Sequence, residues 1–161
     1  MILISPYAKT LRNGSTKHPK NYPWWPEVIQ ELSKSYELMQ IGISGEPILL
    51  DNYKFDLSLT QLRHYILNCE TWIGVDSFFQ HYCWELNKPG VAIFAQSDPN
   101  IFGHKENVNL LKSRSFLRKN QFHIWEQCEY LEEAFVEPPV VVQAVIDLRN
   151  KLCSNLSEVE S

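Results

Sequence analysis

Short apolar runs alternate with stretches of helical periodicity along most of the chain. Strands are expected at residues 2–5, 38–43, 72–75, 91–95 and 107–111, with a possible short strand at 48–50. Helices are expected from Pro26 to about Tyr36, over 59–66, from about 77 to 87, and from Pro138 onward, and a turn is expected at 97–100. Alternating strands and helices form βαβ units, so the pattern predicts an α/β fold, a Rossmann-like three-layer sandwich with a mostly parallel sheet.

Length and composition fit one globular domain. The chain has 161 residues, of which 44% are hydrophobic, and we expect a single domain over 1–153 followed by a polar C-terminal tail at 154–161. No apolar run approaches the roughly 18 to 20 residues that cross a bilayer, and the N-terminus has no secretory leader pattern. We therefore expect a cytoplasmic protein without a membrane span, which begins with a strand.

The four cysteines are widely spaced and form no Cys-x-x-Cys pair, which argues against a disulfide framework and against a zinc site. The sequence gives no other sign of a metal site. The net charge of -4 argues against a nucleic-acid partner, but eight of the fifteen Lys and Arg residues fall in two segments, 9–20 and 112–119. Two basic loops suit a small anionic ligand, although the second run is also typical of a solvated surface segment.

The segment Ile73–His81 is the most informative of the chain. A short apolar run ends in Asp76 and Ser77, and a helix is expected to begin at once. A helix N-terminus at the end of a buried strand directs unpaired N–H groups and partial positive charge at one point, which favours a phosphate. Ser77 and His81 are four residues apart and share a helix face, while Asp76 would cap the helix or bind a hydroxyl. The alternative is that Asp76 and Ser77 are ordinary helix caps and that His81 is solvated.

Four segments in series resemble the C-terminal, nucleotide-sugar-binding half of glycosyltransferase family 9, the heptosyltransferase-like family of GT-B fold. Lys20–Pro23 is similar to the family's Lys-x-Trp-Pro segment, and Ile41–Glu46 to its glycine-containing strand end followed by Glu. Val75–His81 is similar to the Asp-Ser-Gly-x-x-His signature, and Phe94–Pro99 to the Phe-Gly-x-Thr-Asp-Pro turn. The resemblance runs over residues 2 to 150 and implies half of a GT-B fold.

The resemblance also implies roles for individual residues. Lys20 would neutralise the diphosphate of the leaving nucleotide, and Glu46 would accept hydrogen bonds from the ribose hydroxyls. Ser77 and the backbone N–H groups of its turn would hold phosphate oxygens with His81 alongside, and Asp76 would orient that turn or contact the sugar. Such a reaction would be metal-independent, and its donor substrate would be a nucleoside-diphosphate sugar, ADP-linked by analogy with the heptosyltransferases.

Two departures from the family pattern leave alternatives open. Phe78 stands where the family has Gly after Asp-Ser. Either the backbone keeps an ordinary φ and the ring packs aside or against the ligand, or the diphosphate site is altered. In addition, the resemblance places the acceptor site and the catalytic carboxylate in an N-terminal half that precedes the similar region.

The resemblance therefore implies the donor-binding part of a glycosyltransferase, which a partner chain or self-association would complete for glycosyl transfer. A non-catalytic protein that sequesters or senses a nucleotide derivative is the alternative. A third possibility is an interaction scaffold that uses the aromatic segment Tyr22–Trp25, although such a cluster is also typical of packing at a helix entry.

Overall fold

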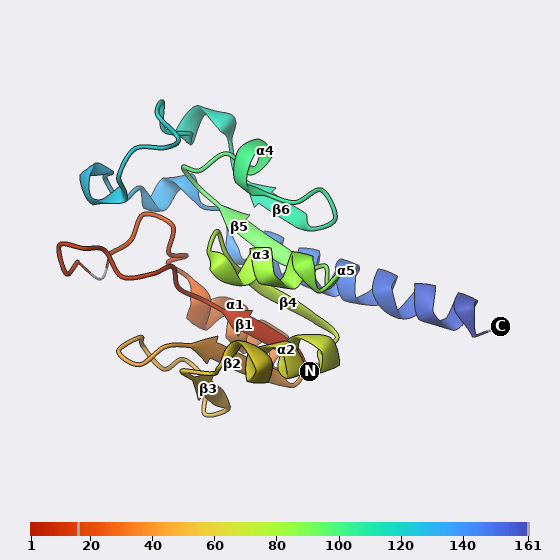
Figure 1. Cartoon of the computed structure of the whole chain (residues 1–161). Coiled ribbons are helices and arrows are strands. Elements are labelled where there is room, and N and C mark those ends of the chain that lie inside the picture. The colour runs from red at the N-terminus through yellow and green to blue at the C-terminus, as the bar shows by residue number, and fades with distance from the viewer. Residues whose placement is uncertain (16, 161) are drawn as a thin grey trace.

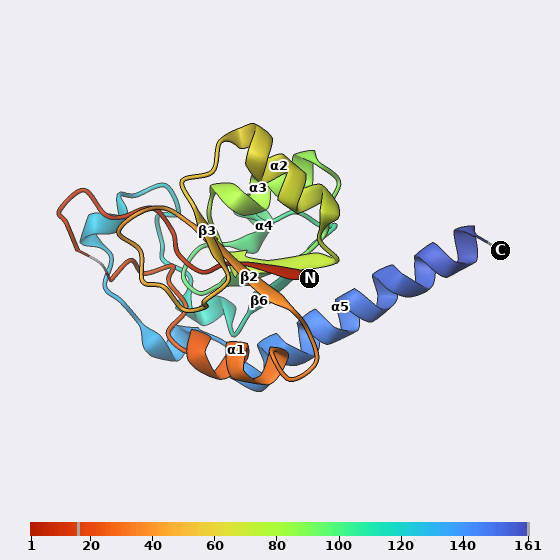
Figure 2. The same cartoon turned by 90° about the horizontal axis from the view of Figure 1, so that it is seen from below.

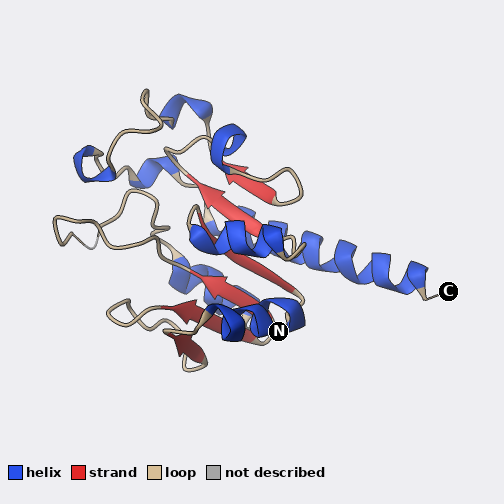
Figure 3. Cartoon of the chain, viewed as in Figure 1, coloured by secondary structure: helices blue, strands red, loops and turns tan. Residues whose placement is uncertain are grey.

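The computed structural model describes residues 1–15 and 17–160 and contains a six-stranded parallel sheet (Figures 1 and 3). The strands are β1 (Ile2–Ser5), β2 (Leu38–Gly42), β3 (Tyr53–Phe55), β4 (Thr71–Val75), β5 (Val91–Phe94) and β6 (Val108–Leu111). Their order in the sheet is β3-β2-β1-β4-β5-β6. The chain therefore builds outward from β1 in one direction, then returns to β4 and builds outward in the other.

Helices cover both faces of the sheet. They are α1 (Trp25–Leu32), α2 (Leu59–Asn68), α3 (Phe78–Glu85), α4 (Pro99–Phe102) and α5 (Pro138–Val159), with 3₁₀ turns at Arg114–Phe116, Trp125–Gln127 and Glu132–Ala134. Figure 2 shows α1 and α5 on one face and α2 and α3 on the other. The predicted fold class, an α/β three-layer sandwich in a single domain, is confirmed.

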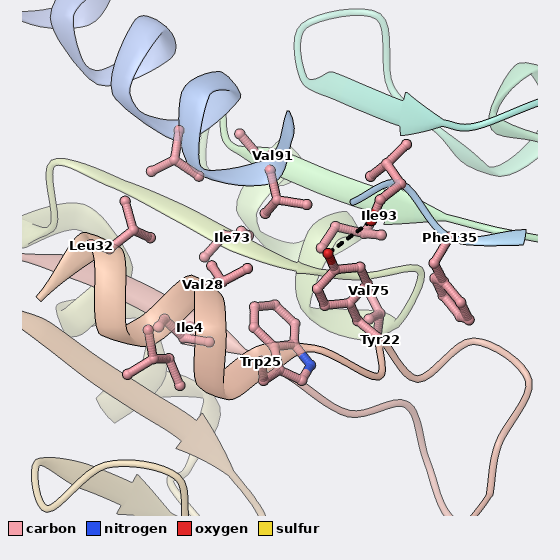
Figure 4. Packing of buried hydrophobic residues seen from close by; sticks show 14 of the residues in the cluster. Ile4, Tyr22, Trp25, Val28, Leu32, Ile73, Val75, Val91, Ile93 and Phe135 are labelled. Carbon is pink, nitrogen blue, oxygen red and sulfur yellow. Dashed lines mark hydrogen bonds between the residues drawn. The ribbon is translucent and has the colours of Figure 1, made fainter. Parts of the chain in front are cut away.

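Alternate residues of the central strands supply two apolar cores. Ile2 and Ile4 point to the core beneath α1 and α5, whereas Leu3 between them points to the core beneath α2 and α3. The same alternation continues in β4 and β5, and all of these side chains are almost completely buried. Figure 4 shows the first core, in which Trp25 and Val28 of α1 pack against Ile73 and Val75 of β4. Burial on both faces explains why the strands are continuous apolar runs.

The aromatic segment before α1 faces inward. Tyr22 is 3% and Trp25 is 2% exposed. The Tyr22 hydroxyl donates a hydrogen bond to the Val136 carbonyl over 2.8 Å, and the Trp25 indole donates to the Pro6 carbonyl over 3.1 Å. The segment therefore packs at the helix entry and fixes both ends of the long loop after β1, and its two most buried rings are not an interaction surface.

Two local predictions are wrong. No strand forms at 48–50, because this segment bonds to a side chain: the Gln40 amide accepts from the Leu49 N–H and donates to the Pro47 carbonyl. Backbone pairing with β2 begins where the Gln40 N–H donates to the Asn52 carbonyl over 3.0 Å, so the strand is β3 at 53–55. The turn expected at 97–100 is the start of α4, where the Asp98 side chain accepts a hydrogen bond from the Asn100 N–H.

The last helix is longer than expected. α5 runs to Val159, so residues 154–159 of the predicted polar tail are helical, while Ser161 lies outside the described residues. Val141, Val145 and Leu148 of the predicted apolar stripe are buried, and the helix then projects away from the sheet (Figures 1 and 2). None of the helices in the described part of the chain is long and apolar enough to cross a lipid bilayer.

Candidate functional site

The strand order reverses between β1 and β4, and a crevice opens at the carboxyl ends of such a pair. Ser5 at the end of β1 pairs with Gly74 of β4. A Cβ atom on Gly74 would lie 2.8 Å from the Ser5 carbonyl oxygen, closer than real contacts allow. The absence of a side chain at Gly74 therefore permits the close approach of the two strands just below the crevice.

A cavity of about 340 Å³ lies beside this crevice, at the carboxyl ends of β1 and β2 and the start of α3. Aliphatic and aromatic side chains form most of its wall, and hydroxyl, carboxyl and amino groups are placed among them. Its lining consists of Ser5, Tyr7, Lys9, Ile41, Gly42, Ile43, Glu46, Asp56, Leu57, Leu59, Leu62, Ser77, Phe78 and Phe79. Three of the six predicted site residues, Glu46, Ser77 and Phe78, are therefore brought together from two separate segments.

Glu46 is half-buried and folds back onto the end of β2. Its Oε2 atom accepts a hydrogen bond from the Ile43 N–H over 3.2 Å, and a Cβ atom on Gly42 would collide with this carboxylate. Burial, with a smaller contribution from the charge of Asp56, raises the pKa of Glu46, while the Ile43 N–H opposes that shift. Burial and the neighbouring Glu46 also raise the pKa of the Tyr7 phenol. Glu46 thus presents carboxylate oxygens at the edge of an apolar cavity.

Ser77 is the N-cap of α3, but its side chain makes no capping hydrogen bond. The first turn of α3 lies beside the cavity, since Ser77, Phe78 and Phe79 all line it. Among the described non-glycine residues only Asp56 and Asn87 have positive φ, so Phe78 keeps ordinary backbone geometry. Its ring is 61% exposed and stacks on Tyr82, with 5.7 Å between ring centroids and 20° between ring planes. Phe78 therefore replaces glycine without strain and adds an aromatic surface at the start of the helix.

Lys20 and Asp76 form an ion pair, with 3.1 Å between Nζ and Oδ2. Asp76 is 3% exposed, and its Oδ1 atom accepts a hydrogen bond from the Gln80 amide over 2.7 Å. The backbone N–H of Lys20 donates to Nδ1 of the buried His18 over 3.1 Å. These contacts hold the loop after β1 in a position from which Lys20 reaches Asp76, the residue that follows β4.

Next to this ion pair lies an aromatic ring that no pattern in the sequence predicted. The Trp125 indole lies 3.3 Å from the Arg118 guanidinium carbon and 5.0 Å from Lys20 Nζ, measured to the ring centroid. His18 also contacts it, with 5.5 Å between ring centroids. Arg118 belongs to the predicted basic run, but Trp125 lies in an irregular segment without periodicity or motif.

Two other residues of the basic run, Arg114 and Lys112, form ion pairs within the molecule. Arg114 forms a bidentate pair with Asp98, with nitrogen–oxygen distances of 3.0 and 2.7 Å, and Lys112 lies 3.3 Å from Glu137. The Arg114 guanidinium holds the pKa of Asp98 below its usual value. Arg114 and Lys112 therefore hold the segment after β6 against its neighbours.

His81 does not line the cavity that contains Ser77. Its Nδ1 atom lies 2.8 Å from Nε2 of His104, which follows α4. Both histidines line a separate cavity of about 220 Å³ on the outer face of α3, and Phe78 is the one residue shared by the two linings. The predicted role of His81 at the ligand of Ser77 stays a prediction.

Comparison with known proteins identifies the fold. No protein-family model matches the sequence, and no curated protein matches it. Among solved structures, a family 9 glycosyltransferase from Veillonella parvula superposes with a TM-score of 0.69 and 17% identity over 93% of this chain and 46% of that chain. ADP-heptose lipopolysaccharide heptosyltransferase II of Escherichia coli superposes with a TM-score of 0.65 and 16% identity, over 94% of this chain and 46% of that chain. A third structure is the dodecameric, iron-containing heptosyltransferase TibC of enterotoxigenic E. coli in complex with ADP-D-β-D-heptose. It superposes with a TM-score of 0.62 and 18% identity, over 98% of this chain and 46% of that chain.

Identities this low show a shared fold. The chain spans about half the length of these solved glycosyltransferases, and the prediction that it has the fold of one half of such an enzyme is confirmed. Among residues 1–15 and 17–160, no group of three or more His, Cys, Asp and Glu side chains could hold a metal ion.

Proposed function

We propose that this domain binds a nucleoside-diphosphate sugar and forms the donor-binding part of a glycosyltransferase. The observation that carries the proposal is the cavity beside the β1–β4 crevice, where Glu46 and Ser77 meet apolar walls next to the Lys20–Asp76 ion pair. Two structural neighbours support ADP as the nucleotide, because one was solved with ADP-D-β-D-heptose and another, the E. coli heptosyltransferase WaaC, with ADP.

The nucleoside would occupy the apolar part of the cavity. The Glu46 carboxylate accepts hydrogen bonds from the ribose hydroxyls, and the apolar side chains of Ile41, Leu57 and Leu62 pack against the base or ribose. Pockets that combine apolar walls with a few fixed polar groups are the usual form of small-molecule sites. The backbone N–H of Ile43 already orients Glu46, so little side-chain freedom is lost when the ligand binds.

The diphosphate would bind at the start of α3. The helix N-terminus attracts negative charge, and the Ser77 hydroxyl, which does not cap the helix, donates to a phosphate oxygen. Lys20 exchanges Asp76 for the diphosphate and stabilises the charge that develops on the nucleotide as the bond to the sugar breaks. Asp76 holds Lys20 in place before the ligand arrives and orients the turn that precedes α3.

Glycosyl transfer also requires an acceptor site and a general base that removes the proton of the acceptor hydroxyl. We propose that an acceptor-binding partner chain or a second copy of this chain contributes them across the crevice. We further propose that the protein acts in the cytoplasm, in keeping with its four free cysteines, two of which are buried.

A non-catalytic role is the second candidate, and Phe78 favours it. The large exposed ring at the first position of α3 occupies space beside the helix N–H groups that the family's glycine would leave open. A domain built in this way would bind a nucleotide derivative, and would sequester or sense it without transferring a sugar.

Calorimetric titration tests the proposal. The ligands are ADP, GDP, UDP, AMP, ADP-glucose, ADP-ribose and a cyclic nucleotide, and the variants are Lys20→Ala and Glu46→Ala. Lys34→Ala and Glu31→Ala are matched controls, because these residues form an exposed ion pair on the surface, with 2.7 Å between Nζ and Oε1. We expect both site variants to weaken binding of one diphosphate class by about tenfold or more, as for the loss of a charge-assisted hydrogen bond, and both controls to leave it unchanged.

Other results would redirect or reject the proposal. A preference for ADP-ribose or the cyclic nucleotide over ADP and ADP-glucose would support the sequestering or sensing role. If a protein shown by circular dichroism to be folded binds none of the panel, the nucleotide site does not exist.

A further inference from the structure

The outer face of α3 carries a cleft that shares only Phe78 with the lining of the proposed donor site. We call it the aromatic cleft and define it by the lining of the smaller cavity: Phe78, His81, Tyr82, Trp84, Glu85 and His104. Five of these side chains are on α3, and His104 closes the cleft from the segment after α4.

The rings of the aromatic cleft are held in fixed positions by one another. Trp84 stacks on His104 with 4.6 Å between ring centroids and 10° between planes, and Phe78 stacks on Tyr82. The His104 ring also contacts His81, edge to face at 5.0 Å. The Tyr82 hydroxyl donates to the Leu59 carbonyl over 3.0 Å, which fixes this ring against the start of α2. The surface is therefore preorganised, and a ligand would order few side chains when it binds.

Two large aromatic side chains of the aromatic cleft are exposed. Phe78 is 61% and Trp84 is 45% exposed. Exposed aromatic surface that surrounds a hollow is typical of a ligand site. Stacked rings leave their outer faces free, and those flat faces suit a ligand with an apolar face of its own.

The polar groups of the aromatic cleft indicate the chemistry of that ligand. The lining contains two imidazoles and the Glu85 carboxylate but no Lys or Arg, so it offers nothing to neutralise a phosphate or carboxylate. Burial and the neighbouring His81 lower the pKa of His104, so its ring is neutral at neutral pH and can both donate and accept. A neutral ring with one apolar face and several hydroxyl groups matches all of these features.

We propose that the aromatic cleft binds the pyranose ring of a sugar. Phe78 and Trp84 contact the apolar C–H faces of the ring, and the histidines and Glu85 bond to its hydroxyl groups. Phe78 lines both this cleft and the nucleotide cavity, so the pyranose is either the sugar of the bound donor or a separate saccharide. The choice between these two sources rests on the proposed function, whereas sugar binding itself does not.

The test follows the indole N–H resonance of Trp84 in two-dimensional ¹H–¹⁵N spectra, assigned by its loss in Trp84→Ala. Methyl pyranosides of the gluco, galacto and manno series are titrated into the free protein and into protein saturated with ADP, and ADP-glucose is compared with ADP. Trp84→Ala and His104→Ala are the cleft variants. Phe122→Ala is the matched control, because Phe122 is a 78% exposed aromatic residue outside the lining.

A saturable shift of the Trp84 resonance with a methyl pyranoside assigns the aromatic cleft to a separate saccharide. A shift with ADP-glucose but not with ADP, together with tighter binding of ADP-glucose, assigns it to the donor sugar. In either case we expect Trp84→Ala to weaken sugar binding about tenfold and to leave ADP affinity within twofold, while Phe122→Ala changes neither.

The proposal is overturned if neither the pyranosides nor ADP-glucose shifts Trp84 more than ADP does. Failure of the nucleotide site gives a different result, because the protein would then not bind ADP at all while the pyranoside titration still reports on the cleft.

Discussion

Gly74 shows how one missing side chain shapes the crevice. Its α-carbon faces Ser5 across the two strands between which the sheet order reverses. A methyl group there meets backbone, not a flexible side chain, so the strands must separate to accept it. The position of the β1 and β4 ends, and with it the relation of Lys20 to Asp76, depends on this contact.

We therefore predict that Gly74→Ala lowers the free energy of unfolding by about 1–3 kcal/mol, the usual cost of overpacking. Chemical denaturation measures this change, and Ser35→Ala, at an exposed position after α1, is the control. A Gly74→Ala protein as stable as the parent would show that β1 and β4 can part without cost.

The sequence predicted where β4 ends and α3 begins, but it did not predict the contacts of the candidate residues at that point. Asp76 and Ser77 were found because a strand ended and a helix began at them, which is local information. The contact between Lys20 and Asp76 depends on how a long loop returns over the sheet, and Trp125 reaches Lys20 from a segment with no periodic pattern. Contacts of this kind are fixed by tertiary packing, which spacing along the chain does not record.

The N-cap of α2 was missed although the information that defines it is local. The helix was predicted from Leu59, Leu62 and Ile66, with Thr60 near its start. Ser58 is the N-cap: its hydroxyl accepts from the Gln61 N–H over 3.2 Å, and the Gln61 side chain accepts from the Ser58 N–H over 2.9 Å. This reciprocal pair is a capping box, and it was present in the sequence as Ser-x-x-Gln.

We predict that Ser58→Ala destabilises the domain by about 1 kcal/mol, because α2 loses its capping hydrogen bond. For a chain of this size the melting temperature should fall by about 2–4 °C, measured by calorimetry. Thr60→Ala is the matched control, since Thr60 is an exposed residue in the first turn and not its cap. Equal effects of the two substitutions would contradict the assigned cap.

Among the strands and helices, the bounds of buried elements were predicted more accurately than those of exposed elements. The strands buried on both faces, such as β4 and β5, were predicted to within a residue or two because nearly every position is apolar. The edge strand β3 was displaced by several residues, since its exposed residues carry no such pattern and the Gln40 side chain takes the hydrogen bonds of the segment before it. The length of α5 was also missed, because its last turns are exposed and polar.

The stability of the whole molecule should depend on pH through His18. This residue is 6% exposed, and its Nδ1 atom accepts the Lys20 N–H. Burial, together with the positive charges of Lys20 and Arg118, lowers the pKa of His18 to about 4, while Glu126 and Asp76 oppose that shift. In the folded protein the His18 imidazole therefore binds a proton only at a lower pH than in the unfolded chain, where its pKa is near 6.5.

Between pH 6.5 and 4 the unfolded chain therefore binds one more proton than the folded protein at this site, and stability falls as the pH is lowered. We predict a loss of up to about 3 kcal/mol across this window, measured by urea denaturation at successive pH values. His18→Asn retains an acceptor for the Lys20 N–H but does not titrate, so its profile should be flatter. The exposed His64→Asn should keep the parent profile, and a parent profile in His18→Asn would contradict the assignment.

The ion pair between Lys20 and Asp76 makes any ligand of the proposed site a competitor of the protein's own carboxylate. A single chloride or phosphate ion offers Lys20 little that Asp76 does not already supply at 3.1 Å. If the proposed site is correct, a nucleoside diphosphate would add contacts with the helix N-terminus and the apolar cavity to its contact with Lys20. We therefore expect single small anions to bind only weakly at Lys20.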